Sequence, residues 1–230
     1  GCNTGSGLYV VDSTGKEHVI PIPGSHPGKD AVSMINIFAI HPLDQQVLLL
    51  GTGAGLKTYH RKTGEVKPLI IKDQDGKAMW GEKFFPTPSG LWMNAGANGF
   101  NFVSKDLRTA VHHYNGATSP IFLPSTRQHI VYVDNDTAIW FCTLDAGLFI
   151  LNPQRNTIRH IEGTNGRNFL GRGMVKDRKG HYWLASEEYG LYELALQPDG
   201  NYQITQWDED DGLQTTKIGL IAIDPQGNIT

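Results

Sequence analysis

The sequence predicts an all-β protein made of β-propeller blades, with about five four-stranded blades that form a segment of a larger propeller of about seven blades. Three observations support this prediction. A glycine followed by a large apolar residue returns every 43 to 48 residues, a tryptophan precedes it at a fixed distance in most copies, and short apolar stretches with turn residues between them fill each interval. A period of this length with four short strands is typical of propeller blades.

The repeat is clearest around the glycine. It occurs five times, each time before Leu or Phe, as Gly7, Gly55, Gly99, Gly147 and Gly190. Seven positions earlier stands a tryptophan in three copies (Trp92, Trp140 and Trp183) and Leu48 in another. Because these tryptophans keep one repeat position, we expect them to fill the space between blades rather than to form a stacking platform for sugars.

Each repeat reads as four strands, which we name A to D in chain order. Strand A is apolar almost throughout, as in Ile35–Ile40 and Ile218–Ile223, so we expect an innermost strand packed on both faces. Strand B carries the tryptophan, and strand C follows the glycine. Strand D mixes Lys, His and Arg with apolar residues, as expected for an exposed edge. Asp, Pro and Gly mark the turns, for example at 177–180.

The whole chain, residues 1–230, is predicted to be propeller. A partial blade with strands B to D occupies 1–24, four blades follow at 31–71, 79–114, 128–162 and 173–207, and strand A of a next blade occupies 217–224. This register places Cys2 inside a strand, in line with Cys142. The alternative for Gly1-Cys2-Asn3 is the start of a mature lipoprotein with Cys2 as the acylated residue.

Composition and charge exclude several classes of protein. The hydrophobic fraction of 39% and the 27 glycines indicate a folded, turn-rich chain. A net charge of -3 gives no electrostatic case for a nucleic-acid partner. No apolar run approaches the ~20 residues that span a bilayer.

No metal or cofactor is expected. The two cysteines have no CxxC spacing, and the nine histidines include no HxxxH or HExxH pair. The acidic run Asp208–Asp211 lacks the alternating pattern of a calcium loop, so we expect a solvated loop there.

The blades resemble the two-component regulator propeller repeat, in which a tryptophan-containing strand precedes Gly-Leu, an aromatic residue and Asp. The matching residues are Gly7–Asp12, Trp140 with Gly147–Phe149, and Trp183 with Gly190–Tyr192, whereas the second and third copies depart with Leu48 and Gly99-Phe100. The resemblance covers essentially the whole chain. It implies the periplasmic, extracytoplasmic sensor region of an inner-membrane receptor whose output is a histidine kinase, a hybrid regulator or a diguanylate cyclase. Implied partners are neighbouring propeller or immunoglobulin-like domains of the same chain, with a homodimer as a further option.

A ligand is expected on the rim that carries the B-to-C turns and the D-to-A loops, because the latter are long and differ between blades. Trp80 offers a stacking face and Arg172 a forked donor. The candidate ligand-binding residues are Trp80, Asn98, Asp145, Arg167, Asn168, Arg172, Glu187 and Tyr189. The expected ligand is an oligosaccharide or another small molecule, and the alternative is that these loops contact a neighbouring domain or partner chain.

The chain is not expected to be an enzyme. It has no GxSxG, no phosphate loop and none of the SxDxGxTW boxes of sialidase-like propellers. A glycosidase needs two carboxylates across its substrate, and Asp145, Glu187 and Glu188 lie in loops of one rim. A propeller glycoside hydrolase or lyase is therefore one alternative to a sensor, and a protein-interaction scaffold is another.

Overall fold

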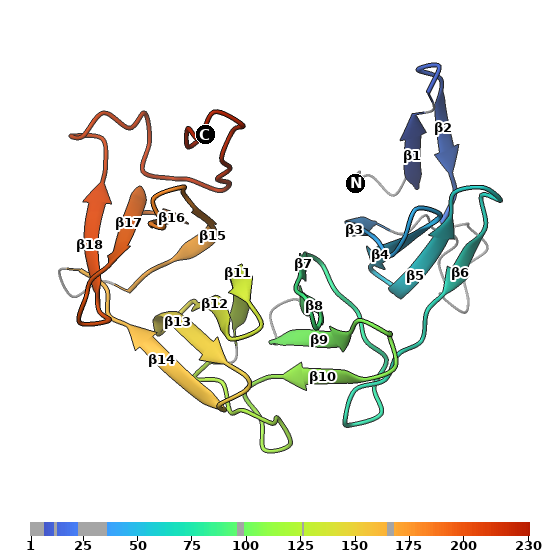
Figure 1. Ribbon diagram of the computed structural model, residues 1–230, viewed down its shortest axis with the longest axis horizontal. Helices are drawn as coiled ribbons and strands as arrows, with labels where there is room; N and C mark the ends of the chain where they lie inside the picture. Colours follow the sequence, from blue (N-terminus) through green and yellow to red (C-terminus); the bar gives the residue numbers. More distant parts are fainter. Residues whose placement is uncertain (1–6, 12, 23–35, 96–98, 126, 165–167) are drawn as a thin grey trace. The chain divides into compact units, whose positions relative to one another are not determined.

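The computed structural model describes residues 7–11, 13–22, 36–95, 99–125, 127–164 and 168–230. The chain forms two compact units, residues 1–113 with 118–120, and residues 114–117 with 121–230. Both are built of β-strands, labelled β1 to β18, and the described residues contain no helix (Figure 1). The predicted all-β class is thus confirmed.

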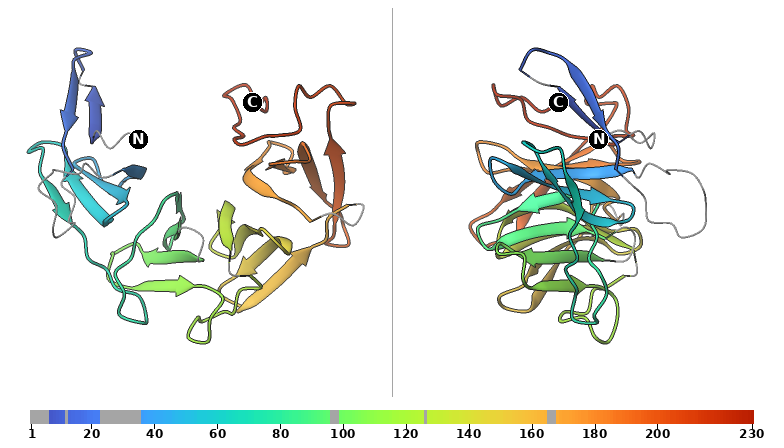
Figure 2. Two further views of the ribbon diagram at one scale, coloured as in Figure 1. Left: turned by 180° about the vertical axis from the view of Figure 1, so that it is seen from behind. Right: turned by 90° about the vertical axis from the view of Figure 1, so that its right-hand side faces the viewer.

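The first unit contains a hairpin and two four-stranded antiparallel sheets. The hairpin pairs β1 (Leu8–Val11) with β2 (Glu17–Ile20) (Figure 2). The first sheet has the order β3 (Ile37–Pro42), β4 (Val47–Thr52), β5 (Gly55–His60) and β6 (Val66–Pro68). The second has the order β7 (Phe84–Pro86), β8 (Gly90–Asn94), β9 (Phe100–Ser104) and β10 (Ala110–His113). In both sheets each strand pairs with the next one in the chain.

The second unit contains two sheets of the same kind. One has the order β11 (Gln128–Asn135), β12 (Ala138–Thr143), β13 (Gly147–Asn152) and β14 (Thr157–Ile161). The other has the order β15 (Gly171–Lys176), β16 (Tyr182–Ser186), β17 (Leu191–Leu196) and β18 (Tyr202–Trp207). Strands A to D of the sequence repeat therefore correspond to the first to fourth strand of each sheet.

The repeat glycine is required by the backbone at the start of strand C. All five copies have φ between 79° and 99°. An L-residue in this region brings its Cβ close to the following carbonyl, which glycine avoids. This conformation explains why the sequence returns to glycine at one position of every repeat.

Two of these glycines provide a graded test of that explanation. Gly147→Ala is expected to lower the free energy of unfolding by about 1 kcal/mol. A Cβ at this position would lie no closer than 3.4 Å to the Asn168 side chain, so only the backbone strain contributes. Gly190→Ala is expected to cost about 2 kcal/mol or more, because its Cβ would also collide with the carbonyl oxygen of Trp207. Urea unfolding followed by circular dichroism measures both. Equal costs for the two variants would contradict the role given to Trp207.

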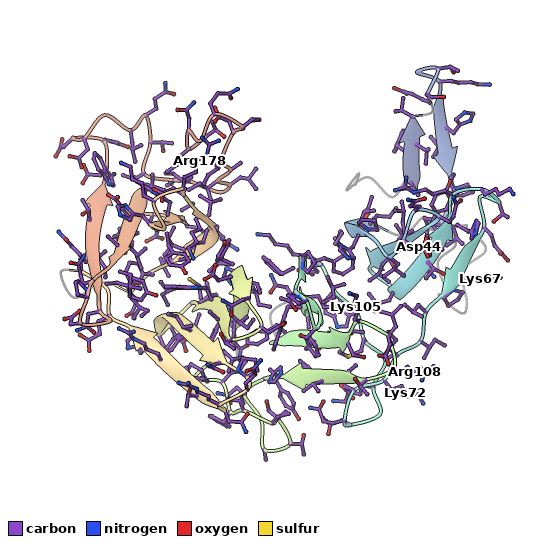
Figure 3. The ribbon with its side chains drawn as sticks, viewed as in Figure 1. Asp44, Lys67, Lys72, Lys105, Arg108 and Arg178 are labelled. Atoms are coloured by element: carbon purple, nitrogen blue, oxygen red, sulfur yellow. The ribbon has the colours of Figure 1, made fainter. Side chains whose placement is uncertain are left out.

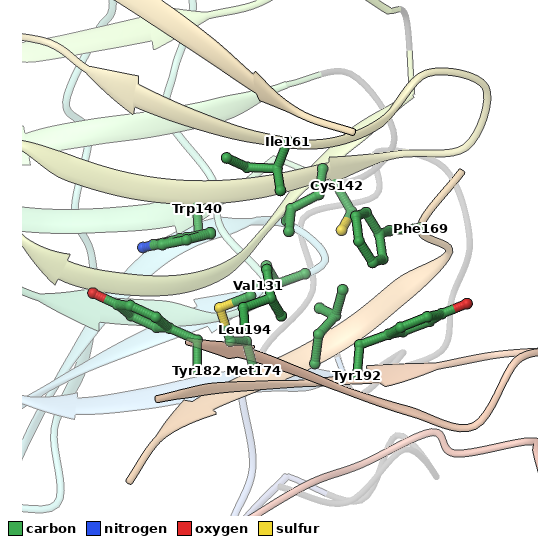
Figure 4. Close-up of a cluster of buried hydrophobic side chains, with 11 residues drawn as sticks. Val131, Trp140, Cys142, Ile161, Phe169, Met174, Tyr182, Tyr192 and Leu194 are labelled. Carbon is green, nitrogen blue, oxygen red and sulfur yellow. The ribbon is translucent and has the colours of Figure 1, made fainter. Parts of the chain in front are cut away.

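The core of the second unit lies between its two sheets. Trp140 on β12 is 1% exposed, and its ring centroid lies 4.5 Å from that of Tyr182 on β16 and 5.3 Å from that of Tyr202 on β18. Met174 on β15 and Leu194 on β17 belong to the same cluster, in the sheet that carries Tyr182 (Figure 4). In the first unit Trp92 is also buried, against Phe100 and Phe102. Both tryptophans are core residues. Trp140 packs between two sheets, as predicted, whereas the ring contacts of Trp92 are with β9 and β10 of its own sheet. Trp183 is only partly buried.

A polar cluster joins the first strands of the two sheets in the second unit. The Lys176 ammonium on β15 lies 3.0 Å from both carboxylate oxygens of Asp134 on β11. The Tyr182 hydroxyl donates to the same carboxylate at 2.9 Å. Burial and this hydrogen bond raise the pKa of Tyr182. The paired charges and this hydrogen bond link the two sheets.

The structure differs from the predicted strands in three places. Residues 217–224 contain no extended strand A and form one isolated bridge, between Ile223 and Ile229. β3 leaves Phe38 and Ile40 exposed, so burial on both faces was the wrong expectation for that strand. β15 begins at Gly171, before the expected 173. Strand B of the partial blade and Cys2 lie outside the described residues.

Candidate functional site

The B-to-C turns are held by a hydroxyl at the end of strand B. The Thr52 hydroxyl donates to the Gly55 carbonyl at 2.7 Å, and the amide of Ala146 donates to the Thr143 hydroxyl at 2.8 Å. Ser186 accepts from the amides of Glu188 and Tyr189 at 3.3 and 3.2 Å. These buried hydroxyls fix the turns that carry several of the candidate residues. These hydroxyls were not among the residues predicted from the sequence, although a Thr or Ser stands three or four positions before the repeat glycine in these copies.

In the second unit the D-to-A loop that precedes β15 is tied to two successive B-to-C turns. The Asn168 side-chain amide donates to the Asp145 carbonyl at 3.0 Å, which links the loop to the turn after β12. The Glu187 amide donates to the Leu170 carbonyl at 3.1 Å, which links the same loop to the turn after β16. The predicted rim of B-to-C turns and D-to-A loops therefore exists here as a connected surface.

Two candidate residues on this rim form an ion pair. The Arg172 guanidinium contacts the Glu187 carboxylate, and their side chains are 46% and 39% exposed. The neighbouring Tyr189 is partly buried and packs against the core cluster, while the Gln206 side chain donates to its carbonyl at 3.1 Å. Asp145, Asn168, Arg172, Glu187 and Tyr189 thus lie on one rim. Together they offer a guanidinium, two carboxylates, an amide and a phenol, which suit hydroxyl-rich ligands.

The other three candidates lie in the first unit or outside the described residues. Trp80 lies in the first unit, where it is partly buried and its carbonyl accepts from the Asn101 side chain at 2.7 Å. Asn98 and Arg167 lie outside the described residues.

An apolar cleft of about 530 Å³ lies between the last sheet and residues 213–230. Trp183 and Trp207 line it with their ring centroids 6.3 Å apart, and Leu191, Leu213 and Ile218 add apolar side chains. At its border the Arg178 guanidinium donates to the Pro225 carbonyl at 2.6 Å (Figure 3). Because Trp183 has the repeat position of Trp140, this cleft corresponds to the surface on which a neighbouring blade packs.

The acidic run forms a hydrogen-bonded turn. The Asp208 amide donates to the Asp211 carboxylate at 3.2 Å, and the Asp210 amide donates to the Asp208 carboxylate at 2.9 Å. Among the described residues no three His, Cys, Asp or Glu side chains cluster in a way that could hold a metal ion. No helix in that part of the chain could cross a membrane.

Comparison with solved structures decides the architecture. The chain superposes on the extracellular domain of the hybrid two-component system BT3049 of B. thetaiotaomicron with a TM-score of 0.60 and 17% identity, covering 98% of this chain and 36% of the other. The extracellular domain of the hybrid two-component system BT4673 of the same organism gives a TM-score of 0.56 and 14% identity, over 98% of this chain and 34% of that one. The sheets are β-propeller blades.

A third similar structure belongs to another kind of protein. PorZ of Porphyromonas gingivalis, a bacterial surface component of the type-IX secretion system, gives a TM-score of 0.65 and 17% identity, over 95% of this chain and 33% of PorZ. This chain spans about a third of the length of each of the three proteins. No protein-family model and no curated protein matches the sequence. At these identities the comparisons establish the fold.

Proposed function

We propose that the chain is a non-catalytic ligand-sensing module of a bacterial signal-transduction receptor, in its extracytoplasmic part, and that it binds a carbohydrate or another small molecule. The observation that carries the proposal is the half-exposed Arg172–Glu187 pair on a rim whose loop is tied to both adjoining turns. Such a preorganised surface on a rigid scaffold loses little entropy on binding. The similarity to the extracellular domains of two hybrid two-component systems supports the sensor class.

Four carboxyl groups of the described residues are unsuited to act as the general acid of a glycosidase. A general acid for glycoside hydrolysis needs a raised pKa. Wherever a carboxyl pKa is shifted here it is lowered, and each of these groups accepts hydrogen bonds in a turn: Asp106, Asp177, Asp199 and Asp224. In Asp177 burial alone would raise the pKa, but hydrogen bonds from the Trp183 indole and from two backbone amides lower it.

The rim is tested by calorimetric titration with a panel of neutral and acidic oligosaccharides. We expect at least one to bind, and we expect Arg172→Ala to weaken it at least about tenfold, or about 1.4 kcal/mol, without a large change in melting temperature. Arg178→Ala, on the opposite A-to-B turns, is the matched control and should keep the affinity. Unchanged binding by Arg172→Ala, or a ligand located at residues 177–180, would show that the other rim is used.

The alternatives give distinct results in the same samples. Turnover of any oligosaccharide by the purified protein would establish the hydrolase or lyase. Binding to a partner protein with no binding to the panel would favour the interaction scaffold, for which the similarity to PorZ is the supporting observation.

A further inference from the structure

The strand β10 stands at the end of the second sheet, so one of its two edges has no strand of that sheet beside it (Figure 1). Such an edge is a template on which another chain can add a strand. In the first unit the last strand of the other four-stranded sheet, β6, carries Lys67 and Pro68, and both residue types discourage such pairing. β10 has the sequence AVHH, without a proline, lysine, arginine or carboxylate.

The side chain of Gln74 occupies this edge of β10. Its Oε1 accepts from the His112 amide and its Nε2 donates to the His112 carbonyl, and both distances are 2.9 Å. Exchange of both bonds with a single residue is the pattern of an antiparallel ladder. A glutamine carboxamide carries the same C=O and N–H groups as a peptide. Gln74 therefore takes the place that a peptide group of a further strand would have.

The turn around Gln74 is fixed by its own hydrogen bonds. The preceding Asp73 has a side chain that is only 3% exposed. Its Oδ1 accepts from the amides of Asp75 and Lys77, both at 2.9 Å. Its Oδ2 lies 3.8 Å from Nδ1 of His112, so a second side chain of this turn reaches the same residue of β10. A preorganised turn lowers the entropy that Gln74 loses when it binds the strand.

We propose that Gln74 closes the edge of β10 against pairing with β10 of a second copy of this chain. Two antiparallel copies of one strand make identical bonds to each other, so this edge is self-complementary. The residues of β10 bring no carboxylate, lysine or arginine that would oppose the pairing. A second copy gains these bonds only by displacing both bonds of Gln74. This edge is separate from the Arg172–Glu187 rim and does not rest on the function proposed for it.

Gln74→Met keeps the length of the side chain and removes both hydrogen bonds. At low protein concentration the His112 amide of this variant should exchange with solvent at least about tenfold faster than that of the parent protein, as measured by NMR. Sedimentation velocity over a concentration series should show self-association at least about tenfold tighter than that of the parent. Gln45→Met makes the same change at an exposed glutamine before β4, and it should alter neither quantity.

A second substitution locates the new contact. His112→Pro, added to Gln74→Met, removes the N–H group that Gln74 binds, and proline is tolerated at such an edge position. This double variant should sediment like the parent. Should it fail to fold, Ala110→Lys in place of His112→Pro gives the same comparison, because two copies would then bring like charges together. The proposal is overturned if Gln74→Met associates no more tightly than the parent, if its His112 amide still exchanges slowly, or if the double variant associates as tightly as Gln74→Met.

Discussion

Replacing Trp140 with alanine is expected to lower the free energy of unfolding by about 4 kcal/mol. The indole is 1% exposed and packs between β12 of one sheet and the tyrosines of the next, with ring centroids 4.5 Å from Tyr182 and 5.3 Å from Tyr202. Its removal leaves a cavity that the two paired sheets cannot close. Its indole nitrogen is buried without a hydrogen-bond partner, so the ring contributes through its apolar volume. Urea unfolding followed by circular dichroism gives the loss.

Trp183→Ala is the matched control, because it removes the same side chain at the same repeat position of the next sheet. Trp183 is only partly buried beside the apolar cleft, and its indole donates to Asp177 at 3.0 Å. The Trp183→Ala variant should therefore lose less than half as much free energy of unfolding as Trp140→Ala. A small and equal cost for both variants would mean that the tryptophans do not hold neighbouring blades together.

The features that could be predicted from the sequence are those in which a single residue meets a local structural requirement. The repeat glycine recurs because strand C starts at positive φ, and Trp140 fills the space between two sheets with its large ring. Whether an apolar segment forms a strand also depends on a neighbouring segment that pairs with it, and this could not be predicted from the segment alone. Residues 217–224 are as apolar as β3, yet a strand needs a neighbour to pair with and this segment has one bridge.

The rim was predictable from connectivity, whereas the contacts on it were not. A chain that pairs each strand with the next returns every B-to-C turn and D-to-A loop to one edge of the sheet. The pairing of Arg172 with Glu187 depends on loop conformation, which the sequence does not specify.

Acidification from pH 6.5 to pH 4 is expected to remove about 3 kcal/mol of stability through His113 alone. Its imidazole is buried on β10 against Trp92 and Phe100, with ring centroids 5.3 and 5.8 Å away, and its Nδ1 has no hydrogen-bond partner. Burial, with a smaller contribution from the neighbouring His112, lowers the pKa of His113 to about 4. The unfolded chain binds this proton near pH 6.5 and the folded chain only near pH 4. Stability is therefore complete above pH 6.5, falls with pH between these values, and has lost this contribution below pH 4.

His113→Phe keeps an aromatic ring on Trp92 and removes the titration, so its free energy of unfolding should fall about 3 kcal/mol less between pH 6.5 and pH 4. A residual slope is expected from His41, whose pKa is also lowered by burial. His160→Phe is the matched control, because that imidazole also stacks on an aromatic ring, Phe149 at 4.6 Å, but is exposed. It should leave the slope unchanged. If His113→Phe and the parent protein lose stability in parallel over this interval, the buried imidazole is not the titrating group, and the acid sensitivity must come from groups elsewhere in the chain.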